Sequence, residues 1–375
     1  MKIPFNKPHF TGKEQRYLLQ AAMKGRFSGN GPYTKEAHDL FRERYGVKKA
    51  LLTTSCTDAL EMMAILFKIQ PGDEVIMPSY TFVSTANAFV LRGAKIVFAD
   101  SMPDHPNIDI DSLESLITPK TKAIVVMHYG GIANDMNRII ALANKYNLLV
   151  AEDAAQSIES TYHGQQLGTI GHLGAFSFHE TKNIVTGEGG MLLVNEESLT
   201  ERAEILWEKG TNRAAFQRGE VQKYEWVDVG SSFLPSDLVA ATLCAQMSHV
   251  EDIQAKRVRH WIKYFEGLKH LQAKGKIQLP IIPEYASING HLFYIVAGDR
   301  SERDRLLGQL QAKGINAVFH YLSLHSSPYY KDKHDGRELP NADRYSDCLI
   351  RLPLYYSLTE KEINYVVKAV EEFYG

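Results

Sequence analysis

The chain reads Ala175-Phe-Ser-Phe-His-Glu-Thr-Lys182-Asn-Ile-Val-Thr-Gly-Glu-Gly-Gly190 between two segments with the composition of buried strands. Lys182 thus follows an apolar run and precedes a glycine-rich turn and a second apolar run, Met191-Leu-Leu-Val194. Most of the 42 lysine and arginine residues are expected to be solvated surface charges, and Lys182 could be one of them. Burial would lower the pKa of its amine, and a neutral amine attacks carbonyl carbons. The stretch therefore predicts a lysine able to form a Schiff base.

A second apolar segment ends in two carboxylates at Asn147-Leu-Leu-Val-Ala-Glu-Asp153. Its composition predicts a buried strand, and open α/β sheets bind ligands at the carboxyl ends of their strands. Asp153 could there keep the ring nitrogen of a pyridine cofactor protonated, while Gln156 reaches a ring oxygen. An aspartate at a strand end also caps a following helix, so the residues alone leave both roles open.

Small hydroxylated residues precede an expected helix in Leu51-Leu-Thr-Thr-Ser-Cys-Thr-Asp-Ala-Leu60. A helix N-terminus offers unpaired N–H groups to a phosphate, although simple capping by serine or threonine explains the pattern as well. Phe82 follows an apolar strand and a proline in Met77-Pro-Ser-Tyr-Thr-Phe82. Its ring could stack on a planar cofactor or belong to the core.

Along the chain the four segments come in the order phosphate-binding turn, aromatic residue, strand-end carboxylate and lysine. In that order they resemble the DegT/DnrJ/EryC1/StrS family of pyridoxal-phosphate sugar aminotransferases, and the resemblance covers nearly the whole chain. Its motifs are Pro71-Gly-Asp-Glu-Val75, Pro78-Ser-Tyr-Thr-Phe-Val-Ser-Thr-Ala-Asn87, Glu152-Asp-Ala-Ala-Gln156, Gly174-Ala-Phe-Ser-Phe178, Gly187-Glu-Gly-Gly190 and His320-Tyr321. Two further motifs resemble the dTDP-4-amino-4,6-dideoxygalactose transaminase branch, which serves enterobacterial common antigen synthesis: Phe176-Ser-Phe-His-Glu-Thr-Lys-Asn183 and Gly168-Thr-Ile-Gly-His172.

The resemblance implies a role for each matching residue. Lys182 is the Schiff-base lysine for pyridoxal 5'-phosphate, Asp153 the partner of the pyridine nitrogen and Gln156 the partner of the ring oxygen. The other implied cofactor contacts are the ring stacker Phe82 and the phosphate contacts Cys56, Thr57, Ser177 and Ser232. The implied substrate contacts are His320, Tyr321 and His325. No metal site is expected, because the cysteines and histidines lack paired spacing.

The chain departs from the family pattern at two places. The family often has Gly-Thr where this chain has Cys56 and Thr57, whose backbone N–H groups can still bind a phosphate. Many relatives carry Asn and Arg where this chain has Ser232 and Leu234. That Asn usually reaches the cofactor phosphate from the partner subunit, so the resemblance implies a homodimer with shared sites, in which Ser232 would donate a shorter hydrogen bond.

The implied reaction moves an amino group from L-glutamate to C4 of a dTDP-linked 4-keto-6-deoxyhexose. The product would be dTDP-4-amino-4,6-dideoxygalactose or its glucose epimer. A sugar 3-aminotransferase remains open, because it differs only in how the hexose lies against the cofactor. A pyridoxamine-dependent sugar dehydratase is disfavoured, since such relatives replace the lysine that stands here at position 182, typically by histidine. The joint presence of Lys182, Asp153 and Gln156 also disfavours a non-enzymatic binding protein on the same scaffold.

The composition agrees with a cytoplasmic enzyme that acts on small molecules. The 375 residues, 44% of them apolar, can build large cores, and a net charge of −2 indicates neither nucleic acid nor an acidic membrane as partner. No apolar run approaches the length of a transmembrane helix, and the start lacks the apolar core of a signal peptide. Three widely spaced cysteines predict a reducing compartment.

The pattern of apolar runs predicts an α/β fold. Strands are expected at Glu74–Met77, Lys95–Phe98, Ala123–Met127, Leu148–Glu152, Gly174–Phe178 and Met191–Val194, with helices between several of them, such as Asp135–Tyr146. Together with the resemblance, this implies a fold-type-I aminotransferase. Its large cofactor-binding domain, residues 1–247, would hold a mostly parallel seven-stranded sheet, and residues 248–375 would form a smaller α+β domain.

Several local features complete this prediction. Thr11-Gly-Lys-Glu14 is expected to be a capping box that opens a helix through about Lys24, and Thr359-Glu-Lys-Glu362 another before the last helix. Gly210–Gly230 reads as a long polar functional loop. In the C-terminal part, helices are expected from Ser248 to Lys269 and near Glu302–Lys313, and strands at Leu292–Val296 and Asn316–Tyr321.

Overall fold

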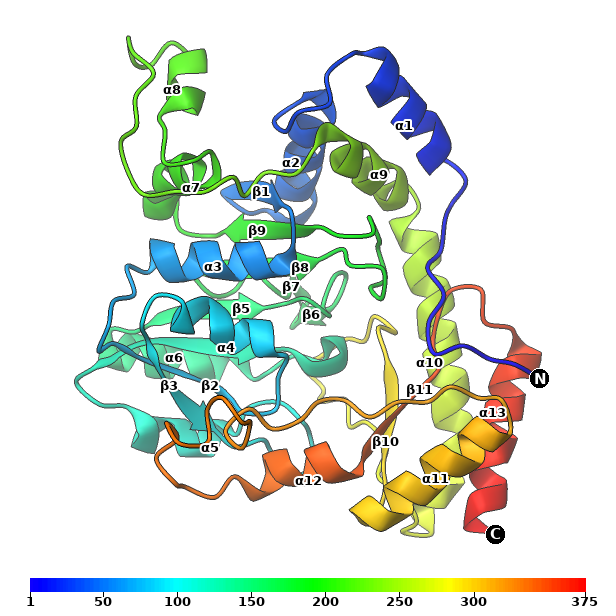
Figure 1. Cartoon of the computed structure of the whole chain (residues 1–375). Coiled ribbons are helices and arrows are strands. Elements are labelled where there is room, and N and C mark those ends of the chain that lie inside the picture. Colours follow the sequence, from blue (N-terminus) through cyan, green and yellow to red (C-terminus); the bar gives the residue numbers. More distant parts are fainter.

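A seven-stranded sheet forms the centre of the protein, whose computed structural model describes all residues from 1 to 375 (Figure 1). Its strands are β1 (Lys49–Thr53), β2 (Glu74–Pro78), β3 (Lys95–Ala99), β4 (Thr121–Met127), β5 (Leu149–Asp153), β8 (Leu173–Ser177) and β9 (Gly190–Val194), in the order β1-β9-β8-β5-β4-β2-β3. All pairs from β3 through β8 are parallel, and β9 runs antiparallel to both of its neighbours. The predicted α/β fold with a mostly parallel sheet is confirmed.

Helices cover both faces of this sheet because its strands are apolar on both sides. On β1, for example, Leu51 belongs to one apolar cluster while Ala50 and Leu52 belong to another on the opposite face. The first face packs against α3 (Cys56–Leu66), α4 (Val83–Val90) and α7 (Thr200–Trp207). The second packs against α2 (Pro32–Tyr45), α6 (Met136–Tyr146) and α9 (Asp237–Met247). Because the strands from β3 through β8 run parallel, their carboxyl ends meet at one edge of the sheet.

The C-terminal part is built on the long helix α10 (Val250–Ala273). Its other elements are β10 (Phe293–Val296), α11 (Arg300–Ala312), α12 (Pro340–Cys348), β11 (Leu349–Leu352) and α13 (Glu360–Tyr374), with β10 and β11 antiparallel. One face of this two-stranded sheet lies in a separate apolar cluster with Trp261 and Val366, whereas Tyr294 and Leu349 on the other face join the main core. The division into residues 1–247 and 248–375 stays a prediction.

The remaining elements are short. They are α1 (Glu14–Met23), α5 (Ile110–Leu113), β6 (Thr161–Tyr162), β7 (Gln165–Gln166), α8 (Arg213–Gln217) and the 3-10 turns Glu114–Leu116, Tyr129–Gly131 and Glu197–Leu199. The segment around α8 projects from the body of the molecule (Figure 1). None of the helices combines the length and apolar character needed to cross a lipid bilayer.

The structure corrects several local predictions. Residues 316–321 are not a strand, because only Val318 pairs, through one bridge to Arg351. The first helix begins at Glu14, whose carboxylate accepts hydrogen bonds from the Thr11 N–H and hydroxyl, but the Thr11 side chain does not cap that helix. The predicted capping box at Thr359 is complete. The polar segment Gly210–Gly230 contains helix α8. Sequence patterns did not predict β1, α2, α7, α9, α12 or β11, whereas the other expected strands lie within two residues of the observed ones.

Candidate active site

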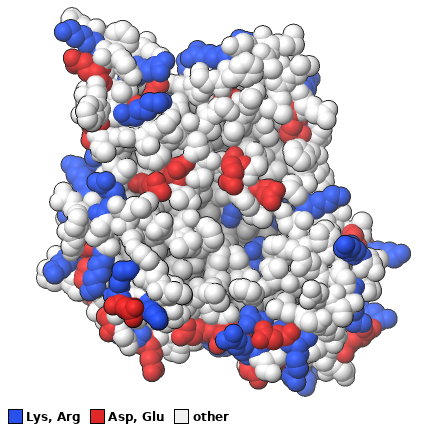
Figure 2. All heavy atoms as spheres, in the orientation of Figure 1, with Lys and Arg blue, Asp and Glu red and all other residues white.

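A cavity of about 580 Å³ opens at the carboxyl ends of β5 and β8, beside the first turns of α3 and α4. This is the edge at which open α/β sheets bind ligands. Figure 2 shows a hollow near the middle of this face, with lysine or arginine atoms inside it and carboxylates along its rim. The predicted site residues that line the cavity are Cys56, Thr57, Phe82, Asp153, Gln156, Ser177, Lys182, His320 and Tyr321.

Lys182 lies in the loop between β8 and β9, as its flanking apolar runs predict. Its backbone N–H donates to the carbonyl of His179 at 2.9 Å, and its side chain lines the cavity. Burial lowers the pKa of the amine, and Arg351 lowers it further, while Cys56 and Asp153 act in the opposite direction. The amine of Lys182 therefore loses its proton more easily than that of an exposed lysine, and the neutral amine is the nucleophilic and basic form.

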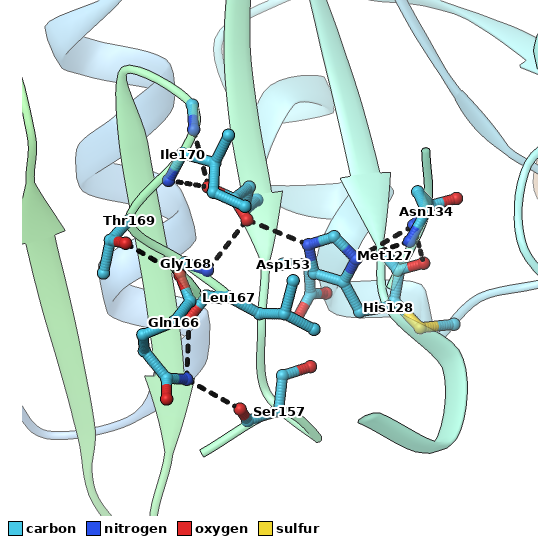
Figure 3. Close-up of polar contacts among 12 residues, drawn as sticks. Met127, His128, Asn134, Asp153, Ser157, Gln166, Leu167, Gly168, Thr169 and Ile170 are labelled. Atoms are coloured by element: carbon cyan, nitrogen blue, oxygen red, sulfur yellow. Dashed lines mark hydrogen bonds and ion pairs between the residues drawn. The ribbon is translucent and has the colours of Figure 1, made fainter. Parts of the chain in front are cut away.

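The carboxylates of Glu152 and Asp153 face different surroundings. Glu152 is fully buried and accepts the backbone N–H groups of Gly168, Ile170 and Gly171 at 2.6–2.8 Å and the ring of His128 at 2.9 Å. Figure 3 shows this network, with His128 held from its other side by Asn134. Asp153 instead lines the cavity, so it is the carboxylate that a ligand can reach.

Asp153 is held in place by two donors. The Thr85 hydroxyl donates to one carboxylate oxygen at 2.6 Å, and the Ala155 N–H donates to the other at 3.1 Å. Thr81 in turn contacts the Thr85 hydroxyl at 2.8 Å. These bonds fix the carboxylate between the carboxyl end of β5 and the first turn of α4, with only 4% of the residue exposed.

Gln156 and Tyr321 form one wall of the cavity. The Gln156 amide group donates to the Tyr321 hydroxyl at 2.9 Å, and its oxygen accepts the Gly130 N–H at 2.6 Å. The Tyr321 ring lies 5.9 Å from that of Phe82, which is 53% exposed although it is a large aromatic residue. An exposed ring at the rim of a cavity offers a flat apolar surface to a planar ligand.

The first turn of α3 offers a site for a phosphate. Ser55 is the N-cap residue, and its hydroxyl accepts the Asp58 N–H at 3.1 Å, which leaves the N–H groups of Cys56 and Thr57 without intrahelical acceptors. The start of β9 passes so close that a Cβ at Gly190 would lie 2.5 Å from the Cys56 nitrogen. Ser177, at the end of β8, lines the same cavity. The cysteine that departs from the family pattern thus leaves the backbone donors available.

Two predicted residues lie outside the cavity. His325 is buried against Ser79, with its Nδ1 2.8 Å from the Ser79 hydroxyl, and it does not line the cavity, so its substrate role stays a prediction. Ser232 is exposed, and its backbone bridges to that of Glu208. Within one chain it therefore makes no contact with the site, and its predicted role in the partner's site stays a prediction.

Arg351 and His291 are among the cavity-lining residues to which sequence reasoning assigned no role. Arg351 is 8% exposed and donates from Nη1 to His320 Nε2 at 3.2 Å. The signal that could have found it is a single charge in the apolar run Leu349-Ile-Arg-Leu352. His291 contacts the Asn183 side-chain oxygen at 3.0 Å, and burial holds the pKa of its ring well below the usual value. No local pattern marks His291.

Comparison with known proteins agrees with this geometry. The model of the DegT/DnrJ/EryC1/StrS aminotransferase family matches residues 9–371. The chain belongs to this family. The prediction of an aminotransferase is thereby confirmed, while the likeness to the dTDP-4-amino-4,6-dideoxygalactose branch stays a prediction.

Individual relatives are similar over their whole length. The chain is 33% identical to the spore coat polysaccharide biosynthesis protein SpsC of Bacillus subtilis (strain 168), covering 99% of this chain and 96% of SpsC. It is 29% identical to the aminotransferase TlmJ of Streptoalloteichus hindustanus, with a TM-score of 0.92 and coverage of 100% and 99%. It is 25% identical to the putative sugar aminotransferase Spr1654 of Streptococcus pneumoniae, with a TM-score of 0.90 for the PLP form and coverage of 100% of both chains. The existence of a PLP form of Spr1654 supports pyridoxal 5'-phosphate as the cofactor.

Proposed function

We propose that this protein uses pyridoxal 5'-phosphate to transfer the amino group of L-glutamate to C4 of a dTDP-linked 4-keto-6-deoxyhexose. The observation that carries the proposal is Lys182, a lysine with a lowered amine pKa in the same cavity as the buried carboxylate of Asp153. The family relationship supports amino transfer, and the motifs shared with the 4-amino-4,6-dideoxygalactose branch favour C4 over C3. The product would be the 4-amino-4,6-dideoxygalactose derivative or its glucose epimer, made in the cytoplasm.

The residues of the cavity fit this cofactor. The Cys56 and Thr57 N–H groups, with the Ser177 hydroxyl, can bind its phosphate at the positive end of α3. A side chain at Gly190 would close this cradle, which supports a ligand in close contact with the backbone there. Asp153 would hold the pyridine nitrogen, and Gln156 would donate to the ring oxygen. Bound pyridoxal phosphate supplies the electron sink that stabilises negative charge on the carbon beside the reacting nitrogen.

The protein's own part in the reaction is to hold and move protons. Lys182 is neutral more readily than an exposed lysine, so its Nζ can accept a proton from a substrate carbon and return it elsewhere. Asp153 has both oxygens oriented by Thr85 and Ala155, so it does not need to reorganise when charge develops on the ring. Phe82 would cover one ring face and restrict access of water.

A homodimer completes the proposal. The arm 213–229 projects from the body of the molecule and exposes aromatic side chains, including Trp226 at 82% and Tyr224 at 51% (Figure 1). Large exposed aromatic residues are frequent at protein interfaces. A second copy of the chain that packs on this arm would bury them and bring Ser232 close to a neighbouring site.

The test is the structure of the product. The protein would be incubated with pyridoxal phosphate, L-glutamate and dTDP-4-keto-6-deoxyglucose, and in parallel with the corresponding 3-keto sugar. We expect nitrogen at C4 by NMR in the first mixture and no amino sugar in the second. Nitrogen at C3 in the second mixture alone would replace the C4 proposal, and loss of water from the sugar without amination would indicate a dehydratase.

A further inference from the structure

A second cavity, the arm groove, lies between the projecting arm and the β1 edge of the sheet. It has a volume of about 470 Å³, which is within the size range of small-molecule sites. One wall comes from α2 and β1, and the other from α7 and from α8 on the arm (Figure 1). The arm groove shares no lining residue with the cavity that contains Lys182. Amino transfer therefore does not account for it.

Positive charge dominates the lining of the arm groove. Its two carboxylates, Asp39 and Glu204, are outnumbered by its cations, which are Lys35, Arg42, Lys48, Lys49 and Arg218. Glu204 pairs with Lys49 at 2.7 Å and with Arg218 at 3.0 Å. Asp39 pairs with Arg42 at 3.1 Å, so Lys35 and Lys48 remain without a carboxylate partner. A cleft lined by unpaired charge of one sign concentrates ions of the other sign.

The sequence of α2 builds the basic wall. Lys35, His38 and Arg42 follow one another at helical spacing, so they share the face of α2 that lines the arm groove. Ala37 and Phe41 lie on the other side of the helix, in an apolar cluster that packs against the sheet. The packing of these apolar residues therefore fixes the direction in which the polar face points.

His38 adds a neutral donor to this wall. Its Nε2 accepts the Leu52 N–H at 2.8 Å at the free edge of β1. Burial and the charge of Lys49 lower the pKa of the His38 ring to about 3, so the ring is neutral at pH 7. A neutral imidazole carries one proton, which must reside on Nδ1 because Nε2 accepts. Nδ1 forms no hydrogen bond within the protein, so this N–H is available to a ligand in the groove.

We propose that the arm groove binds the phosphate groups of a small anion and thereby fastens the arm to the body of the protein. Lys35 and Lys48 supply the unpaired charge, and His38 Nδ1 supplies an oriented donor. Arg218 lines the same groove from the arm, so one anion can contact both walls. Phosphate suits this set because each group offers several oxygens to donors that come from different directions. The proposal is independent of the proposed function.

Calorimetric titration of the holoenzyme with inorganic diphosphate tests the site. The bound cofactor occupies the phosphate cradle at α3, so that cradle does not compete for the probe. Replacement of two lysines together, Lys35→Gln with Lys48→Gln, should raise the Kd at least about tenfold, because charge-assisted hydrogen bonds are lost. Lys361→Gln is the matched control, since Lys361 is exposed on α13 and does not line the groove. Binding should also weaken as salt is added.

Two further measurements test the connection to the arm. Arg218→Gln should raise the Kd for diphosphate at least about threefold. Lys223→Gln should leave it unchanged, because Lys223 is an exposed arm residue that does not line the groove. Amide hydrogen exchange of residues 213–229 should slow at saturating diphosphate in wild type, and should not respond in the double lysine variant.

A parallel titration with dTDP separates the two sources of a diphosphate group. A raised Kd for both probes in the double lysine variant supports a site that also accepts a nucleotide, and a raised Kd for inorganic diphosphate alone supports a site for the free anion. Circular dichroism and cofactor content of each variant confirm folding.

Two outcomes would overturn the proposal. Absence of diphosphate binding at millimolar concentration, or an equal Kd in wild type and in the double lysine variant, would remove the site. A Kd that responds to the lysines, but neither to Arg218→Gln nor through slower exchange of the arm, would contradict the bridge between arm and body.

Discussion

Glu152 and Asp153 are adjacent carboxylates on β5 that the structure assigns to different tasks. The sequence identified Asp153 as the residue at the strand end, but it held no sign that three backbone N–H groups and His128 surround Glu152. Those donors come from the loop 168–171 and from the end of β4, which are far from Glu152 in the sequence. Only the parallel pairing of β4, β5 and β8 brings them together.

The two carboxylates give opposite predictions. Asp153→Asn keeps the shape of the residue but removes the charge opposite the ring nitrogen, so turnover should fall about a hundredfold or more with little change in Tm. Glu152→Gln places an amide group against N–H donors, so it should lower the free energy of unfolding by about 2–4 kcal/mol. Steady-state kinetics and thermal unfolding of both variants test this pair. Normal turnover in Asp153→Asn would reduce that carboxylate to a structural role.

Lys182 predicts a specific pH dependence of stability. Its pKa in the folded protein is lowered by burial, so between the folded and unfolded pKa values the unfolded chain binds more protons. Folding therefore becomes more favourable as pH rises through that interval. In the cofactor-free protein, the Tm of wild type relative to Lys182→Met should rise as the pH increases toward the unfolded lysine pKa of about 10.4. Parallel Tm profiles for the two proteins would show that the amine is not desolvated.

At the scale of elements, the cofactor cradle depends on how closely β9 passes the start of α3. Sequence reasoning placed both the lysine loop and the α3 N-terminus, because apolar runs and hydroxylated caps are local signals. It missed β1, whose residues Lys49–Thr53 lead directly into the cap. It also predicted a strand at 316–321, where a single bridge at Val318 forms instead. The secondary structure of these two segments depends on pairing with distant parts of the chain, which local composition does not encode.

Gly190 provides the test of this close approach. A Cβ there would meet the Ser55 backbone and the Cys56 nitrogen at 2.5 Å, so Gly190→Ala must displace the first turn of α3. We expect a loss of about 1–3 kcal/mol in unfolding free energy and weaker binding of pyridoxal phosphate. Gly308→Ala is the matched control, because it lies in α11 with open space around it and should stabilise the protein by up to about 1 kcal/mol. Unchanged cofactor affinity in Gly190→Ala would contradict the cradle.

At the scale of the whole molecule, the projecting arm 213–229 exposes aromatic side chains that no other part of the chain covers. Sequence reasoning identified the segment 210–230 from its polar composition, but not the exposed aromatic residues on it as a surface. We expect sedimentation to show a dimer, and Trp226→Ser to shift it toward monomer because the largest exposed ring is removed. A monomeric wild type at micromolar concentration would contradict the shared site.

Mixed dimers test whether Ser232 acts across the interface. In a heterodimer of Lys182→Ala and Ser232→Glu chains, action in trans places both defects in one site and leaves the other intact. Activity should then recover toward half of the wild-type value per dimer, although each homodimer is impaired. Confirmed heterodimers without recovery would place Ser232 within its own site or outside catalysis.

The central claim is that Lys182 is the residue that carries the cofactor and the proton. Reduction of the holoenzyme with borohydride, followed by peptide mass spectrometry, locates the attachment directly. We predict one pyridoxyl phosphate group per chain, on the peptide that contains Lys182, and no label in Lys182→Ala, which should also lose at least about a thousandfold in turnover. Label on another lysine, or an Ala variant with near-native turnover, would contradict the account.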